Sequence, residues 1–269
     1  MGKAEFLRVS SKDCPRRRRV ADLMRTSNPT LNDKVFTSLS GAQGETMTLE
    51  GTVNKTGILL LCAVATAAWT WHLAMNPATL PLDYLLLVVG LIGGLIFALV
   101  TTFKKSWSPV TAPIYALLEG LVLGGISATL EQRYPGIAIE SVSLTFGTMF
   151  VLLLAYRSGM IKVTQKFRLG VVAATGAIFL FYMVEIVLGF FGIHFVAVNG
   201  SGLMGIGISL VIVGIASLNL VLDFDFIERG VAAGAPKYME WYGAFGQMVT
   251  LIWLYLEMLR LMAKLRGRR

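Results

Sequence analysis

The sequence has little cysteine, histidine or charge, and each shortage excludes a class of protein. It contains two cysteines and two histidines in 269 residues. Cys14 lies in a polar leader and Cys62 in an apolar run, so neither a disulfide framework nor a paired-cysteine metal site is indicated. Only 15% of the residues are charged, 55% are hydrophobic, and the mean hydropathy is +0.67. These values exclude a soluble domain with a wetted surface and predict an integral membrane protein.

The first 56 residues also lack an apolar run behind their basic patch, so no cleavable signal peptide is predicted. They are rich in Ser, Thr, Asn and Gly, which predicts a disordered leader. Residues 1–23 are an upstream extension if synthesis starts at Met24.

Seven apolar runs are long enough to cross a bilayer as helices, which takes about 20 residues each. A β-barrel is excluded, because its strands need only about 10 residues and alternate between apolar and polar side chains. We therefore predict an all-α integral membrane protein, with a leader at 1–56, a membrane domain at 57–265 and a basic tail at 266–269. The runs are 57–75, 83–103, 110–130, 137–156, 169–193, 203–226 and 241–263.

The basic residues are distributed unevenly over the loops, which indicates the orientation of the chain. The leader, the second loop and the fourth loop are basic, whereas the first loop carries Asp83. This predicts a cytoplasmic N-terminus in the plasma membrane, and it explains the net charge of +8 without nucleic acid. Seven crossings place the end of the chain outside, against the same rule. Either the last segment spans incompletely, or the earlier loops outweigh the basic residues there, which are Lys264, Arg266, Arg268 and Arg269.

Carboxylates inside the apolar runs are the main candidates for function, since charge in a membrane is costly. Among the basic residues, only Arg260 accompanies them within the runs. Such a set must be protonated, be hydrated or bind a cation, and carboxylate oxygens suit calcium. The candidates are Glu119, Glu185, Asp223, Asp225 and Glu257, with Glu228 close behind them.

Each of these acids also has a structural interpretation. Glu119 stands beside Gly120 on a face of small residues, which predicts a hydrogen bond across a tight helix contact. Glu185 is nearer the outer end of its run, where a protonated or snorkelling side chain is expected. Glu257 precedes Arg260 by one helical turn, so a local ion pair is its alternative role.

Asp223 and Asp225 lie two residues apart in "LDFDFIERG". On a helix they therefore point about 200° apart and cannot face the same partner. Asp223 shares its face with Asn219 and is predicted to be the buried one. Asp225 is predicted to run with Glu228 and Arg229 toward the cytoplasmic surface.

Several longer stretches are similar to one known family. They include "GTVNKTGILLL", "SPVTAPIYALLEGLVLGGIS", "NLVLDFDFIERG" and "GAPKYMEWYGAFGQMVTLIWLYLEMLRLMAKL". On these stretches, residues 24–269 resemble the Bax-inhibitor-1 family of membrane proteins, in particular a bacterial branch with a longer leader. The resemblance implies seven helices with the last one central, and a passive calcium leak that responds to pH.

The resemblance also implies the residues that control the leak. The aspartate of the family's sixth helix matches Asp223. The aspartate of its seventh helix matches Glu257, so this chain has a glutamate at the second position. Two neighbouring carboxyls cannot both ionise easily, so the pair is expected to act as a proton-sensitive latch. Asp225 and Glu228 then form an acidic cytoplasmic mouth, and Glu119 is accessory.

The connection between the two matched acids departs from a simple hairpin. Such a hairpin puts Asp223 near the cytoplasm and Glu257 deep in the membrane. The two meet only if the sixth helix continues past Arg229 or the seventh begins late.

Two other functions remain open. In the first, the chain is an interaction protein that modulates a membrane protease or a stress or cell-death pathway, with structural acids and a docking leader and tail. The second, an intramembrane aspartyl protease, is disfavoured because no glycine stands two residues before an intramembrane aspartate, as a GxGD motif requires. We predict no enzyme, no organic cofactor and no nucleic-acid partner. The expected partners are the bilayer, calcium ions, protons and, in the first alternative, a membrane protein.

Overall fold

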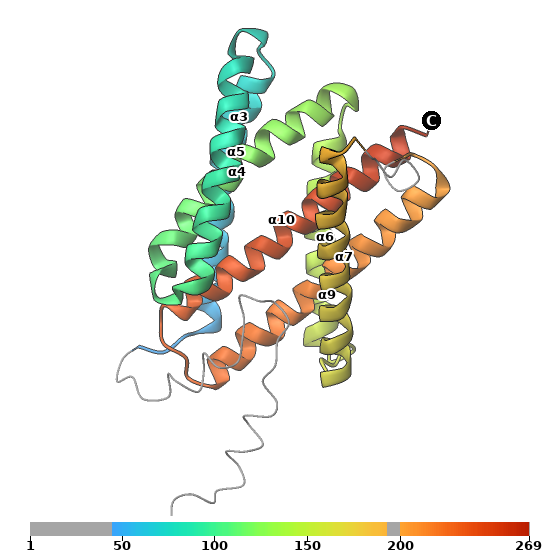
Figure 1. Ribbon diagram of the computed structural model, residues 1–269. Helices are drawn as coiled ribbons and strands as arrows, with labels where there is room; N and C mark the ends of the chain where they lie inside the picture. The colour runs from blue at the N-terminus through green and yellow to red at the C-terminus, as the bar shows by residue number, and fades with distance from the viewer. Residues whose placement is uncertain (1–44, 193–199, 269) are drawn as a thin grey trace, which may run out of the picture.

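The computed structural model describes residues 45–192 and 200–268, and in this part of the chain seven long α-helices are joined by short connections (Figure 1). The all-α prediction is confirmed. Most of the predicted leader, including Cys14 and Met24, lies outside the described residues. The helices are α3 (Leu49–Ala74), α4 (Leu80–Phe103), α5 (Ser108–Arg133), α6 (Ile137–Arg157), α7 (Gln165–Phe190), α9 (Leu203–Ala232) and α10 (Met239–Arg266).

Six helices, from α3 to α9, are long enough and apolar enough to cross a membrane. The seventh helix, α10, has 28 residues, which corresponds to about 42 Å. It is more polar because it faces protein: α10 packs against α9, α3, α6 and α5, as its diagonal course between the other helices shows (Figure 1). The predicted central position of the last helix is confirmed. Since α10 is one continuous helix, it is not a re-entrant segment.

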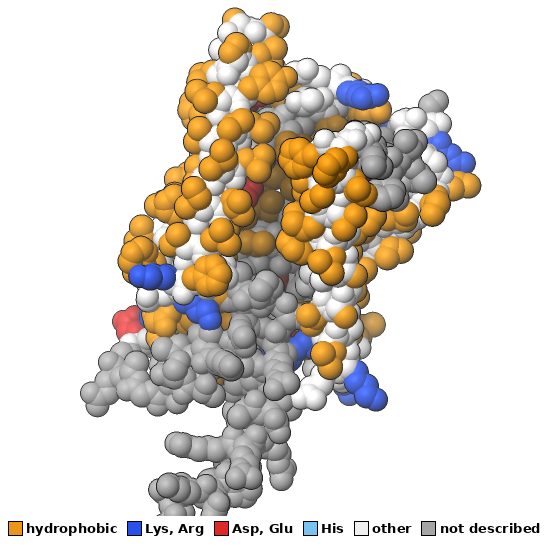
Figure 2. Space-filling model, viewed as in Figure 1, with side chains coloured by type: hydrophobic (Ala, Val, Ile, Leu, Met, Phe, Trp, Pro, Cys, Tyr) orange, Lys and Arg blue, Asp and Glu red, His pale blue; other side chains and the backbone are white. Residues whose placement is uncertain are grey.

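The surface agrees with a membrane environment. On the face shown in Figure 2, hydrophobic side chains cover the helices over most of their length, and Lys and Arg side chains gather towards the two ends. The exposed hydrophobic residues include Leu91 at 55% exposure and Phe179 at 61%. Apolar flanks with charged ends are the pattern that a bilayer requires.

Two helices extend furthest beyond the predicted runs, for local reasons. The first helix starts at Leu49, before the predicted Gly57, because the Thr48 side chain accepts a hydrogen bond from the backbone N–H of Gly51 and caps it. The helix α9 continues to Ala232, and Gly234, with φ of +65°, then turns the chain.

The helices α3 and α5 are in backbone contact. A Cβ atom added to Gly120 would lie 2.0 Å from Thr66 Oγ1, and one added to Gly124 would lie 2.0 Å from Thr70 Oγ1. The Thr66 hydroxyl donates across the contact to the carbonyl of Leu117, at 2.9 Å. The predicted face of small residues is therefore used for close helix packing.

Candidate functional site

The acids of α9 and α10 lie in one helix hairpin but at different levels. Asp223 is 2% exposed and Glu257 is 1% exposed. Ile227 packs beside Gly243, which sets Asp223 level with Gln247 in this antiparallel pair. Glu257 lies about ten residues further along α10, or ~15 Å at 1.5 Å per residue. Although α9 extends past its predicted end, this register keeps the two carboxyls apart.

Asp225 is neutralised by arginines from two helices. Its Oδ2 atom lies 2.9 Å from Arg168 Nη2, at the start of α7, and 2.8 Å from Arg229 Nη2, one turn later on α9. Arg168 precedes the predicted run at 169–193, so the sequence analysis did not count it with Arg260 among the cations within the runs, but it is buried against α9. Asp223 is the more deeply buried of the two aspartates, as its helical face predicted.

Glu228 lies beyond this cluster, on the exposed side of α9. Its carboxylate accepts a hydrogen bond from the Tyr156 hydroxyl at the end of α6. The region predicted to be an acidic mouth therefore combines two acids with two arginines and a tyrosine, and its charges are balanced.

Glu257 is held by a tyrosine and an arginine. The Tyr182 hydroxyl donates to its Oε1 atom at 2.8 Å, and Arg260 Nη1 lies 3.0 Å from the same atom. The local ion pair with Arg260 is thus present. Two turns further, the Lys264 ammonium donates to Ser209 Oγ at 2.8 Å and is buried between α10 and α9. Lys264, which the sequence analysis counted among the basic residues at the end of the chain, is therefore part of the helix bundle.

These contacts reveal a polar stripe on α7 that the sequence analysis missed. Arg168, Thr175 and Tyr182 are each two helical turns apart, so they share one face. Each of these three side chains forms a hydrogen bond with the hairpin, and Thr175 accepts one from the side-chain amide of Asn219 at 2.8 Å. The spacing is visible in the sequence and was the available signal. The helix α7 is therefore attached largely through polar groups.

Glu119 lies outside the hairpin, on α5, whereas Glu185 lies on α7, close enough to Lys264 of α10 for an electrostatic interaction. Glu119, on α5, is half-buried and has a hydrogen bond with Tyr115, one turn earlier. Its carboxylate packs against α4, where a Cβ atom on Gly94 would lie 3.2 Å from it. Glu185 is half-buried on α7. The hydrogen bond of Glu119 thus stays within α5, and its packing partner is α4, whereas the face of small residues contacts α3.

Asp83 was predicted to be a loop charge, but it lies in the first turn of α4 and is only 4% exposed. Its carboxylate faces α5, where a Cβ atom on Gly125 would lie 3.3 Å from it. It is therefore a further carboxyl inside the helix bundle.

The structure shows no metal-binding cluster of acidic side chains among the residues that it describes. No group of three His, Cys, Asp or Glu side chains in this part of the chain has the geometry to hold a metal ion. A hollow of about 460 Å³ opens over α10 between α3, α5 and α6, and no charged residue lines it. This hollow therefore holds none of the candidate carboxyls.

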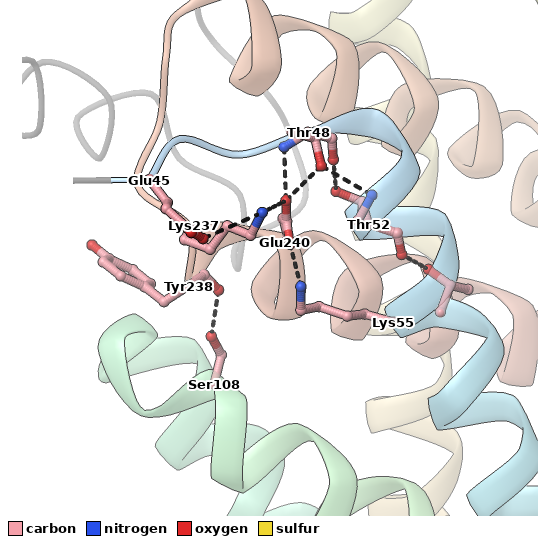
Figure 3. Close-up of polar contacts among 10 residues, drawn as sticks. Glu45, Thr48, Thr52, Lys55, Ser108, Lys237, Tyr238 and Glu240 are labelled. Carbon is pink, nitrogen blue, oxygen red and sulfur yellow. Dashed lines mark hydrogen bonds and ion pairs between the residues drawn. The ribbon is translucent and has the colours of Figure 1, made fainter.

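Glu240, at the start of α10, is a carboxylate with hydrogen-bond or ion-pair partners on both oxygens, and the sequence analysis did not select it. It is 0% exposed. Its Oε1 atom accepts hydrogen bonds from both the backbone N–H and the hydroxyl of Thr48, each at 2.8 Å, and Lys55 forms an ion pair with Oε2 (Figure 3). Lys237 adds a second ammonium, 3.4 Å from Oε1. Thr48 and Lys55 lie far from Glu240 in sequence, so no local pattern predicts the cluster.

The surroundings of Glu240 also fix its charge. Burial by itself raises the pKa of this carboxyl, but the Lys55 ammonium and the hydrogen bonds from Thr48 outweigh burial and hold the pKa of Glu240 at about 2. Glu240 precedes the apolar run that starts at Trp241. It stays ionised at physiological pH, so it acts as a permanent anion and does not sense protons.

A comparison with known protein families identifies one family that covers these helices. The model of the family described as Bax inhibitor 1 like matches residues 28–267. The chain belongs to the Bax inhibitor 1 like family. The match includes all seven helices of the structure, and it identifies this family member as a multi-pass membrane protein. Neither the comparison with curated proteins nor that with solved structures found a significant match.

Proposed function

We propose that this Bax inhibitor 1 like protein is a passive, pH-sensitive calcium leak. The observation that carries the proposal is the deep burial of two carboxyls, Asp223 and Glu257, on the two neighbouring helices α9 and α10. Ionisable residues at membrane depth mark ion and proton paths, and calcium takes carboxylate oxygens as ligands. The resemblance of these two positions to the family's acid pair supports the same assignment.

The separation of the two acids changes how they act. Carboxyls about 15 Å apart along a helix do not share a proton. We therefore assign them to two successive levels of one path, where each attracts a calcium ion when ionised and ceases to do so when protonated. Glu119 is the accessory acid on the α4–α5 side. Asp225 keeps a supporting role, because two arginines balance its charge, whereas Glu257 forms an ion pair with one arginine, the half-exposed Arg260.

We place the protein in the plasma membrane with the end that holds Glu240 in the cytoplasm. In the described residues, this end carries most of the loop cations, which lie before α5, after α6 and before α7. The opposite end has fewer. This distribution supports the orientation under the positive-inside rule. The cations at the proposed cytoplasmic end are Lys104, Lys105, Arg157, Lys162 and Lys166.

The test is calcium entry into proteoliposomes between about pH 5 and pH 8. The wild type is compared with Asp223→Asn, Glu257→Gln and the control Glu50→Gln, which alters an exposed acid on α3. We expect a flux that changes with pH in the wild type and the control, and a flux without this dependence in the two variants.

Two other outcomes have distinct meanings. Wild-type vesicles that are no leakier than empty ones at every pH would reject the leak and favour a protein that modulates a membrane partner. Variants that leak with unchanged pH dependence would reject the two acids as the sensors and leave the leak itself standing.

A further inference from the structure

Residues Glu45–Thr48, here called the strap, cross the turn between α9 and α10 (Figure 3). Thr46 forms an antiparallel bridge with Pro236. The backbone N–H of Met47 donates to the carbonyl of Ala235 at 2.6 Å, and that of Lys237 donates to the carbonyl of Glu45 at 3.0 Å. The strap therefore adds a strand-like pairing to a turn that lies at the other end of the sequence.

The side chain of Met47 is inserted beneath this pairing. It is 2% exposed and packs between the end of α9 and the start of α10, in a cluster with Phe226, Met239 and Tyr242. Phe226 lies less than one turn from Asp223, the buried acid of the proposed path. The strap thus fills the space between the two helices that carry the path.

Thr48 fastens the strap by a hydroxyl with two roles. It accepts from the N–H of Gly51, which caps α3, and it donates to Glu240. The fit is close, because a Cβ atom on Gly51 would lie 2.3 Å from Glu240 Oε1. Lys55 holds the same carboxylate from the next turns of α3. Loss of the Glu240 contacts would weaken the attachment of the strap and of the first turn of α3 together.

We propose that the strap is a latch that holds the α9–α10 hairpin closed, and that calcium passes only when the strap lifts. The inference rests on the leak proposed above.

The latch is independent of pH. The charged groups that face Glu240 are Lys55 from α3 and Lys237 from the turn, and Glu45 lies 3.7 Å from Lys237. The contacts of Glu240 hold its pKa at about 2, below the ordinary value near 4.3. Their stabilising effect is therefore fully present above about pH 4.3 and is lost only as the pH falls towards 2. Proton sensing and strap release are therefore separate controls.

A reversible crosslink tests the latch in the closed direction. Thr46 and Pro236 face each other without a mutual hydrogen bond, and such antiparallel pairs have Cα atoms about 4.5 Å apart, within reach of a disulfide. Thr46→Cys and Pro236→Cys are combined in a chain that carries Cys14→Ser and Cys62→Ala. We expect oxidation to lower the calcium flux at least about tenfold and reduction to restore it. A confirmed crosslink that leaves the flux unchanged would overturn the proposal, and Thr46→Cys alone controls for oxidation.

A second variant tests the open direction with a readout that does not require flux. Lys55→Gln weakens the hold on Glu240, and Lys162→Gln is its control at an exposed loop position. Each is combined with Met47→Cys in the same cysteine-free chain, and the maleimide labelling rate of that position is measured.

We expect Lys55→Gln to raise both labelling and flux about threefold or more at every pH, with the pH dependence retained. Equal labelling in the two variants would overturn the latch. If wild-type vesicles show no flux, the leak fails, and the labelling rates then decide by themselves whether the strap is a releasable latch.

Discussion

The helices α5 and α7 both have 26 residues and are both apolar enough to cross a membrane, yet the bundle holds them in opposite ways. In their most apolar stretches, 56% of α5 is buried but only 11% of α7. The backbone of α5 touches α3 at Gly120, whereas α7 is attached through Arg168, Thr175 and Tyr182. Lipid tails are as apolar as the side chains, so helices in a bilayer associate through close packing or polar contacts. This chain uses the first for its scaffold and the second for a peripheral helix beside its acids.

The largest expected effect comes from filling the α3–α5 contact. Gly120→Leu forces the two backbones apart, because a Cβ atom there already lies 2.3 Å from the carbonyl oxygen of Ala63. We expect a loss of about 3 kcal/mol or more in the free energy of unfolding. Gly176→Leu on α7 is the matched control, since no atom lies within 4 Å of its Cβ position. Thermal unfolding in detergent measures both, and equal losses would break the comparison.

The ion pair at the start of α7 is expected to have an intermediate effect. Arg168→Gln and Asp225→Asn each leave a partly buried charge with fewer partners. In a double-mutant cycle we expect a coupling free energy of about 1–2 kcal/mol, reduced by the neighbouring Arg229 and by the side chains' partial exposure. Arg157→Gln, an exposed position on α6, is the control. Coupling below the error of the cycle would show that α7 is not held by this pair.

The smallest effect is expected at the other end of α7. Tyr182→Phe removes the hydroxyl that donates to Glu257. Hydrogen bonds between membrane helices contribute about 0.6 kcal/mol on average, and this one involves a charged acceptor, so we expect about 1 kcal/mol. Tyr84→Phe, at 66% exposure, should change nothing. The midpoint of thermal unfolding measures both, and a loss as large as that of Gly120→Leu would contradict a loosely attached α7.

Local features of this fold were predictable from the sequence, and long-range ones were not. Apolar runs of sufficient length gave the helices, and the angle between successive residues gave Asp223 as the more buried aspartate. The i, i+3 spacing gave the pair of Glu257 and Arg260. Each of these depends on geometry within one helix, where the residue number determines the direction of the side chain.

The contacts between helices depend on register, which spacing within one helix does not determine. Arg168 neutralises Asp225 and Lys55 neutralises Glu240 across many intervening residues. The acids therefore appeared to have fewer cations than they do. The burial of Lys264 was missed for the same reason, because its buried partners lie on α9 and a lysine near a chain end resembles an exposed one.

The polarity of α10 has a consequence for how the protein is made. Six helices meet the composition expected of membrane spans, but α10, which follows them along the chain, does not. A helix of this kind enters a bilayer poorly by itself, since each central charge opposes insertion by about 3 kcal/mol. Its charged residues find their partners on α3, α7 and α9. The earlier helices therefore provide the polar partners that lipid lacks, and we expect α10 to enter the membrane only after they are in place.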